Sequence, residues 1–255
     1  MREDTNLRDA VVAICDAVRE GGDGSVLEYT RRWDFPDART LEVPSTAIEA
    51  AVERVRAIGL WDALQEASVR IERFHAQHRR TTWIDSTVPG EILGQRLLPL
   101  ESVGVYVPGG RAAYPSTVLM AGIPARVAGV GRRILATPPT EETGLPPDAT
   151  LAAARIAGFD QVFAMGGAQA VAAMAYGTET VPAVDKIVGP GNAYVNAAKR
   201  HVFGVVGIDM LAGPSEVGIV GDNHADPGGI AAEWICQTEH DPDNRALVVV
   251  FSESA

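Results

Sequence analysis

The residues that could do chemistry are concentrated between Asp185 and His240, where polar side chains follow apolar runs and Gly-Pro turns. The segment contains VDKIVGPGNAYVNAAKR, GIDMLAGPSEVGIV and ADPGGIAAEWICQTEH, in that order. Asn192 follows the first turn, Ser215 follows the second, and Gln237 and His240 end the third stretch. Parallel α/β sheets bind ligands at the turns that follow their strands. The segment therefore predicts a ligand-binding edge.

A further amide, Gln169, lies in the sequence GGAQA at 166–170. The two glycines permit a sharp turn, which would place Gln169 in the first turn of a helix. A side-chain amide both donates and accepts hydrogen bonds, which suits a ribose or a nicotinamide amide. The alternative for Gln169 and Asn192 is a plain helix-capping amide. Taken by itself, Tyr106 indicates a packed aromatic residue.

The run 226–240 predicts a helix with Asp226 as its N-cap, followed by proline. His240 lies three residues after Gln237 and four after Cys236, so the three share one face. Such a pair can present two ligands to a divalent metal, and imidazole is the expected one. Spacing alone favours Cys236 over Gln237 as its companion. The alternative is a histidine that only complements the end of the helix.

The elements that must position these residues are strands alternating with helices rich in small residues. Six runs predict strands: SVGVYVP, RRILATPP, QVFAMGG, DKIVGPG, EVGIVGD and ALVVVFS. Their alternation with helices predicts parallel βαβ units in an open sheet. Glycine turns at 109–110, 166–167 and 189–191 follow three of the strands, and none is a GxGxxG fingerprint. The fold class is therefore α/β, with mostly parallel Rossmann-like sheets and an incomplete dinucleotide fold.

The first part of the chain predicts a helical region. Apolar residues at helical spacing indicate a helix over 7–33, broken at Gly21-Gly22, and a second helix with Ser45 as its N-cap. A long amphipathic helix follows over 61–77, and 88–99 predicts a hairpin or extended pair. We expect packing and subunit contact to be the roles of these helices.

The overall composition restricts the partners. The 255 residues carry 22 Lys and Arg against 33 Asp and Glu, a net charge of −11, which argues against nucleic acid as the main partner. No run reaches the roughly 18 apolar residues that a membrane helix needs. The two cysteines, Cys15 and Cys236, have no disulfide spacing, and the N-terminus lacks the pattern of a signal peptide. These features predict a cytoplasmic protein.

From Ser102 to Asp241 the chain closely resembles histidinol dehydrogenase. The similar stretches are SVGVYVPGGRAAYPSTVLMAGIPARVAGV, GGAQAVAAMAYGTETVPAVDKIVGPGNAYVNAAKR, GIDMLAGPSEV and QTEHDPD, and EGGDGSVLEYTRRWD at 20–34 is similar more loosely. The resemblance implies oxidation of L-histidinol through the aldehyde to L-histidine, with two NAD⁺, a bound zinc and a homodimer. It also implies three regions: helices and the start of a first α/β domain at 1–101, an NAD-binding domain at 102–215, and a return to the first domain at 216–255.

The resemblance also implies the roles of site residues. Tyr106, Gln169 and Asn192 match NAD contacts, and Ser215 matches a substrate-binding serine. Gln237 and His240 match a pair that contacts the substrate and ligates zinc, which replaces Cys236 as the metal ligand and leaves it a packed apolar residue.

In the family, the chain continues beyond the position of Ala255 with an acid/base Glu-His pair and further zinc ligands. The resemblance therefore implies that this chain is a fragment, which we expect to be inactive alone. His201 and His224 have no matching context and are expected on the surface. Two alternatives remain: a non-catalytic remnant that binds NAD, and a paralogous zinc- and NAD-dependent dehydrogenase that acts on another amino or sulfonated alcohol.

Overall fold

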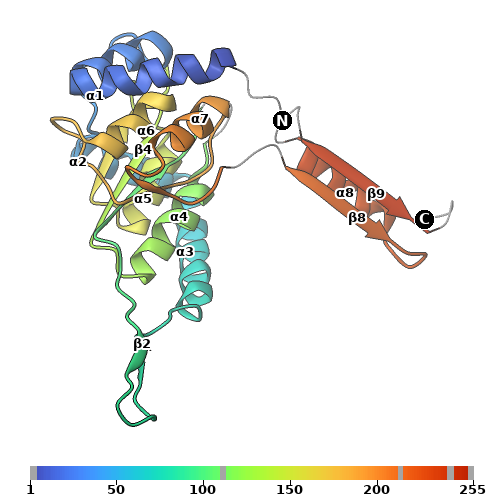
Figure 1. The fold of residues 1–255 in the computed structure, drawn as a ribbon. Helices are drawn as coiled ribbons and strands as arrows, with labels where there is room; N and C mark the ends of the chain where they lie inside the picture. The colour runs from blue at the N-terminus through green and yellow to red at the C-terminus, as the bar shows by residue number, and fades with distance from the viewer. Residues whose placement is uncertain (1–4, 110–112, 212–214, 240–243, 252–255) are drawn as a thin grey trace. The chain divides into compact units, whose positions relative to one another are not determined.

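The computed structural model of the protein describes residues 5–109, 113–211, 215–239 and 244–251. The chain forms two compact units, Met1–Leu211 and Ala212–Ala255 (Figure 1). In the described part of the chain, no helix is both long and apolar enough to span a membrane.

A five-stranded sheet in the order β5-β4-β3-β6-β7 is the centre of the first unit, and every neighbouring pair is parallel. Its strands are β3 (Ser102–Tyr106), β4 (Arg132–Thr137), β5 (Gln161–Ala164), β6 (Lys186–Val188) and β7 (Gly207–Ile208). The chain places β4 and β5 on one side of β3, then β6 and β7 on the other. This is the order of the first five strands of a Rossmann fold. It confirms the predicted α/β class with a mostly parallel sheet.

Helices cover both faces of this sheet. They are α1 (Thr5–Trp33), α2 (Ser45–Ala57), α3 (Leu60–Ala76), α4 (Pro115–Val127), α5 (Asp148–Ala157), α6 (Gly167–Tyr176) and α7 (Ala193–Val202). Helices α1, α6 and α7 pack together over one apolar core, and α2 to α5 pack over a second. All five residues of β3 are buried, as expected for a parallel strand covered on both sides.

Helix α1 is bent at Gly22, whose φ of 55° lies in the left-handed region, and this confirms the predicted break. A side chain there would collide with the carboxylate of Glu179. Glu179 also accepts a hydrogen bond of 2.7 Å from the Asp23 amide, which ties the bend to the segment after α6. The second half of α1 then ends at Trp33.

Two local predictions need correction. Ser45 is the first residue of α2 and not its N-cap, because the extended backbone of Pro44 already ends the preceding segment and its carbonyl accepts the amide of Ala47 at 2.9 Å. The hairpin also begins earlier than predicted: β1 (Trp83–Asp85) pairs antiparallel with β2 (Leu93–Gln95), so its first strand precedes residue 88.

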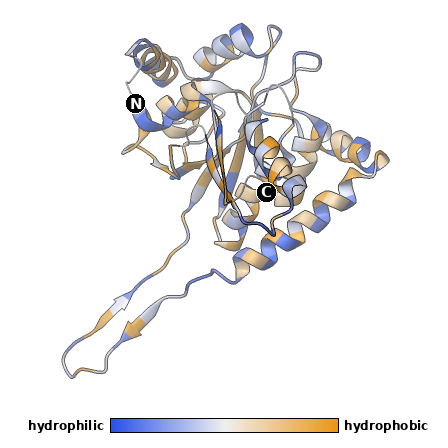
Figure 2. Cartoon of the chain, turned by 90° about the vertical axis from the view of Figure 1, so that its right-hand side faces the viewer, coloured by the Kyte–Doolittle hydropathy of each residue, from blue (hydrophilic) through white to orange (hydrophobic). Residues whose placement is uncertain are grey.

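The β1–β2 hairpin extends away from the helices and the sheet, and apolar residues lie along it (Figure 2). Trp83, Ile84 and Ile92 are 52%, 71% and 77% exposed. Since the hairpin has no apolar core of its own, its two short strands are held chiefly by their own ladder.

The second unit contains two parallel strands, β8 (Glu216–Gly221) and β9 (Arg245–Val250), with helix α8 (Pro227–Thr238) packed against both. Both strands and the helix confirm the sequence predictions. The Asp226 carboxylate caps α8 by accepting the amides of Gly228 at 3.1 Å and Gly229 at 3.0 Å, as predicted. The assignment of 216–255 to one domain with 1–101 stays a prediction.

Candidate functional site

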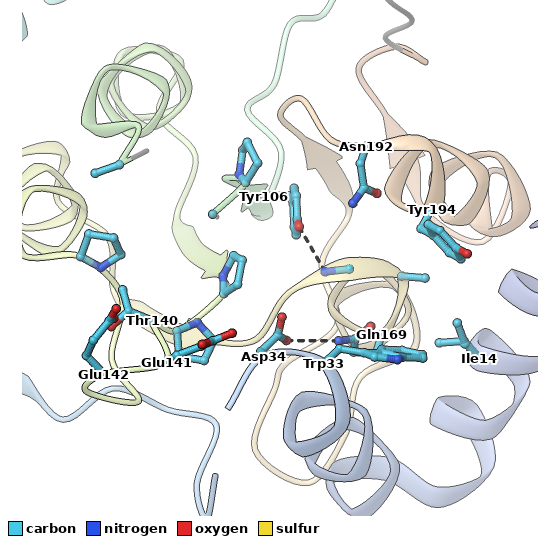
Figure 3. Close-up of a pocket in the computed structure, with 18 residues that line it drawn as sticks. Ile14, Trp33, Asp34, Tyr106, Thr140, Glu141, Glu142, Gln169, Asn192 and Tyr194 are labelled. Atoms are coloured by element: carbon cyan, nitrogen blue, oxygen red, sulfur yellow. Dashed lines mark hydrogen bonds between the residues drawn. The ribbon is translucent and has the colours of Figure 1, made fainter. Parts of the chain in front are cut away.

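A pocket of about 920 Å³ lies at the carboxyl ends of the parallel strands (Figure 3). It is lined by residues at or just after the ends of four different strands, among them Tyr106, Pro138, Gly167 and Asn192. Open α/β sheets bind ligands at this edge, where the strand order reverses. Its size is within the range of small-molecule and cofactor sites.

Tyr106 ends β3 and is 3% exposed. Its hydroxyl accepts a hydrogen bond of 3.1 Å from the amide of Gly167, at the start of α6 (Figure 3). Burial raises the pKa of Tyr106 to about 12, the Gly167 amide opposes that shift, and the negative charge of Asp34 adds to it. The side chain is therefore a neutral phenol at neutral pH, with its proton available for a donor bond. It is both a packed aromatic and a lining residue.

Gln169 lies in the first turn of α6, as predicted, and is 1% exposed. Its Nε2 donates to Oδ2 of Asp34 at 3.5 Å (Figure 3). Its Oε1 is buried without a hydrogen-bond partner among the described residues. Because buried polar atoms are nearly always paired, an orphaned acceptor in a pocket wall indicates a ligand that donates to it.

Asn192 is the N-cap of α7, and its Oδ1 accepts the amide of Val195 at 3.1 Å. The capping alternative is therefore correct, and the same residue also lines the pocket. The turn before it needs glycine at position 189, where φ is 118° and a side chain would collide with the carbonyl of Tyr106. The close approach of β6 and β3 thus brings Asn192 to Tyr106's end of the pocket.

An ion pair between a buried ammonium and a partly exposed carboxylate fixes this turn. The Lys199 side chain is fully buried, and its Nζ donates to the Gly189 carbonyl at 2.9 Å and to the Asp209 carboxylate. Burial alone would raise the pKa of Asp209, but hydrogen bonds from Lys199 and from the amides of Gly189 and Met210 lower it overall. The sequence did not identify this pair, because nothing in VNAAKR distinguishes a buried lysine from an exposed one.

Asp34 is the site residue that sequence reasoning missed. It follows the last residue of α1, and its Oδ2 accepts the Gly166 amide at 3.3 Å in addition to the Gln169 amide. Burial raises its pKa to about 6, although the hydrogen bond from Gly166 opposes the shift. The available signal was weak: the stretch EGGDGSVLEYTRRWD ends on this residue.

In the second unit the structure brings Ser215 and Gln237 close to one residue, Asn244. The Asn244 side chain accepts the Ser215 amide at 2.8 Å and donates to the Gln237 carbonyl at 3.1 Å. Ser215 precedes β8 and is exposed, and Gln237 lies in the last turn of α8 and is partly buried. The third predicted member, His240, lies outside the described residues.

The described residues do not form a complete metal centre. Within 5–109, 113–211, 215–239 and 244–251, no group of three or more His, Cys, Asp or Glu side chains could hold an ion. Cys236 is exposed and not a packed apolar residue, which corrects the role that the resemblance left to it. His201 and His224 are exposed, as expected.

The comparisons with known proteins agree with this fold. A family model described as histidinol dehydrogenase matches residues 1–255. This chain belongs to the histidinol dehydrogenase family. The match includes the N-terminal helices, so the family relationship is not confined to 102–241, where the resemblance is most apparent in the sequence.

Individual histidinol dehydrogenases cover nearly all of this chain. That of Listeria innocua is 48% identical over 247 residues, or 97% of this chain and 57% of its own. That of Burkholderia pseudomallei is 49% identical over 263 residues, or 99% of this chain and 58% of its own. The crystal structure of the enzyme from Elizabethkingia anophelis has a TM-score of 0.92 at 38% identity and covers 99% of this chain and 58% of its own. The chain spans a little over half the length of these relatives.

Proposed function

We propose that this chain carries the NAD-binding part of a histidinol dehydrogenase, an oxidoreductase of histidine biosynthesis that converts L-histidinol through L-histidinal to L-histidine with two NAD⁺. One observation carries the proposal. In a chain that matches the family over its whole length, Tyr106, Gln169 and Asn192 come from the ends of three different strands and line one pocket. A homodimer and a cytoplasmic location belong to the same proposal.

The residues of the pocket fit NAD⁺. The orphaned Oε1 of Gln169 needs a donor, which a ribose hydroxyl or the carboxamide can supply. The hydroxyl of Tyr106 and the amide of Asn192 supply donors in return. The N-terminus of α7, directly after Asn192, favours a phosphate group. When bound, NAD⁺ provides the acceptor for the hydride that leaves the alcohol carbon.

In this proposal, the side chains of the chain bind and orient the cofactor and the substrate. Because the pKa of Tyr106 is about 12, it acts as a hydrogen-bond donor and not as a base. We assign Ser215 and Gln237 to the binding of the substrate, with Asn244 fixing the backbone of both. Positioning of this kind contributes to rate by removing the entropy of bringing reactants together.

We also propose that Gln237 and His240 supply two zinc ligands, although the described residues alone do not complete a zinc site. The acid/base pair that the resemblance implies has no match in residues 1–255, so we expect this chain to bind NAD⁺ without turning over L-histidinol.

Isothermal titration of the 255-residue protein with NAD⁺ tests this proposal. We expect saturable binding at one site per chain, and no NADH absorbance when L-histidinol is then added. The absence of NAD⁺ binding would contradict the assignment of the pocket. NADH formation by the chain alone would contradict our expectation that the acid/base pair is not among residues 1–255.

A further inference from the structure

The end of β4 lacks the acidic residue that Rossmann domains use to bind a ribose. In those domains an Asp or Glu at the end of the second strand accepts hydroxyls of the adenosine ribose. Here β3 is the first strand and β4 the second, and β4 is followed by Pro138 and Pro139. The residues directly after β4 therefore carry no carboxylate, and the nearest ones along the chain are Glu141 and Glu142.

Asp34 reaches this position from outside the sheet. A side chain built on Gly166 would meet Cβ of Pro138 at 3.0 Å and Oδ1 of Asp34 at 3.1 Å. Asp34 and Pro138 thus pack against the same side of the turn before α6, and both line the pocket. The end of α1 places a carboxylate beside the residue that occupies the acidic position of other Rossmann domains.

Two acceptor oxygens, one on Asp34 and one on Gln169, have no hydrogen-bond donor among the described residues. The hydrogen bonds from Gly166 and Gln169 both end on Oδ2 of Asp34, so Oδ1 accepts none from the described residues. Oε1 of Gln169, on the side chain that donates to Asp34, is buried and has no hydrogen-bond partner among the described residues. Because Nε2 of Gln169 donates to Asp34, the carboxylate also fixes which way the amide faces. Two acceptors on side chains that are hydrogen-bonded to each other match the two O–H donors of a vicinal diol.

The charge beside Asp34 favours a diol over the 2′-phosphate of NADP⁺. Asp34, Glu141 and Glu142 line it, and the described lining residues include no lysine or arginine. A 2′-phosphate placed against a carboxylate would be repelled, and no described lining residue compensates its charge.

We propose that Asp34 accepts the hydroxyls of the adenosine ribose together with Gln169, and that it sets the preference of this pocket for NAD⁺ over NADP⁺. The inference rests on the proposed function and adds a residue to it. Asp34 thus replaces, from α1, the carboxylate that β4 lacks.

The first test compares Asp34→Asn with the wild-type protein in titrations with NAD⁺ and NADP⁺. Asparagine keeps the size of the side chain and an acceptor for Gly166. We expect the affinity for NAD⁺ to fall roughly tenfold, as for loss of a charged hydrogen bond. The ratio of the affinity for NAD⁺ to that for NADP⁺ should therefore become smaller. Asp37→Asn is the matched control, because Asp37 is exposed, lies in the same segment and does not line the pocket.

A second test leaves the protein unchanged and uses the 2′-deoxyadenosine analogue of NAD⁺. The analogue should bind the wild-type protein more weakly than NAD⁺, and Asp34→Asn should no longer distinguish the two. Equal affinity of the wild-type protein for both ligands would overturn the inference and leave the proposed function intact. If the wild-type protein bound none of these nucleotides, the proposed function itself would be contradicted.

Discussion

Gln169 carries the most direct sign that the pocket takes a ligand, since it is buried and one of its atoms, Oε1, has no partner in the part of the chain that the structure describes. We predict that Gln169→Ala weakens NAD⁺ binding roughly tenfold, the effect of losing about one hydrogen bond. Gln161→Ala is the control, because Gln161 begins β5 at the opposite edge of the sheet. Titration calorimetry of both variants measures the effect. Equal losses in the two would contradict a specific role for Gln169.

Asp34 should make stability depend on pH. Its pKa is about 6 in the folded protein against an ordinary value of 3.8, so between these values the folded state holds a proton that the unfolded state releases. The folded state binds more protons there, and its stability therefore falls as the pH rises through this window. Glu141, Glu142 and Tyr106 face the same pocket and are unchanged in an Asp34 variant.

Urea unfolding of the wild-type protein and Asp34→Asn at about pH 4 and about pH 7 measures this effect. The variant should gain stability relative to the wild-type protein at the higher pH. A difference that is the same at both values would show that Asp34 titrates normally.

At the residue scale, the sequence could locate Tyr106, Gln169 and Asn192 because each lies beside a strand end or a glycine turn. It could not locate Asp34 or Lys199. Asp34 reaches the pocket only through the packing of α1 on α6, and the burial of Lys199 depends on Asp209 being brought beside it. Both are consequences of tertiary contacts that local patterns do not encode.

At the scale of elements, the turn between β6 and α7 depends on the Lys199–Asp209 pair. We predict that Asp209→Ala destabilises the protein by about 3 kcal/mol, because it leaves the buried ammonium without its partner. The double variant Lys199→Met with Asp209→Ala should recover part of this loss. Urea unfolding of the wild-type protein, Asp209→Ala, Lys199→Met and the double variant gives the four free energies of unfolding that the comparison needs. A double variant as unstable as the sum of both single variants would show that the two side chains act independently.

The predicted strands and helices were correct where the apolar runs were long. The predicted bounds were wrong where the local backbone conformation decides where an element begins. The six predicted strands all exist, whereas β7 has only two residues and carries no periodic signal. Asp226 caps α8 as its position before proline predicts, while Pro44 takes the capping position that Ser45 was expected to hold. The predicted bounds of the hairpin were wrong because all residues of its two strands are exposed, so the sequence shows no alternation of apolar and polar residues there.

At the scale of the whole molecule, the fold class followed from the alternation of strands and helices, but the placement of the N-terminal helices did not. Helices α1 to α3 complete both faces of the parallel sheet instead of forming a separate layer. Their amphipathic pattern indicates only that they pack against something. Which helices they contact depends on how the shapes and volumes of side chains match in the folded protein, and a single sequence does not show this.

The affinity of the chain for Zn²⁺ gives a further prediction. Gln237 and His240 are two neutral ligands, so Zn²⁺ should bind weakly and EDTA should leave the thermal unfolding midpoint unchanged. His240→Ala should abolish the weak binding, and His201→Ala should not. Tight one-to-one binding in a zinc titration would mean that other side chains, such as Cys236 or Glu233, complete a site.

The central claim is that the pocket at the carboxyl edge of the sheet binds NAD⁺. A crystal structure of the protein grown with NAD⁺ tests it most directly. We predict electron density for the dinucleotide in contact with Tyr106, Gln169 and Asn192, with a ribose against Asp34. Dinucleotide density at another place, with this pocket filled only by water, would contradict the account.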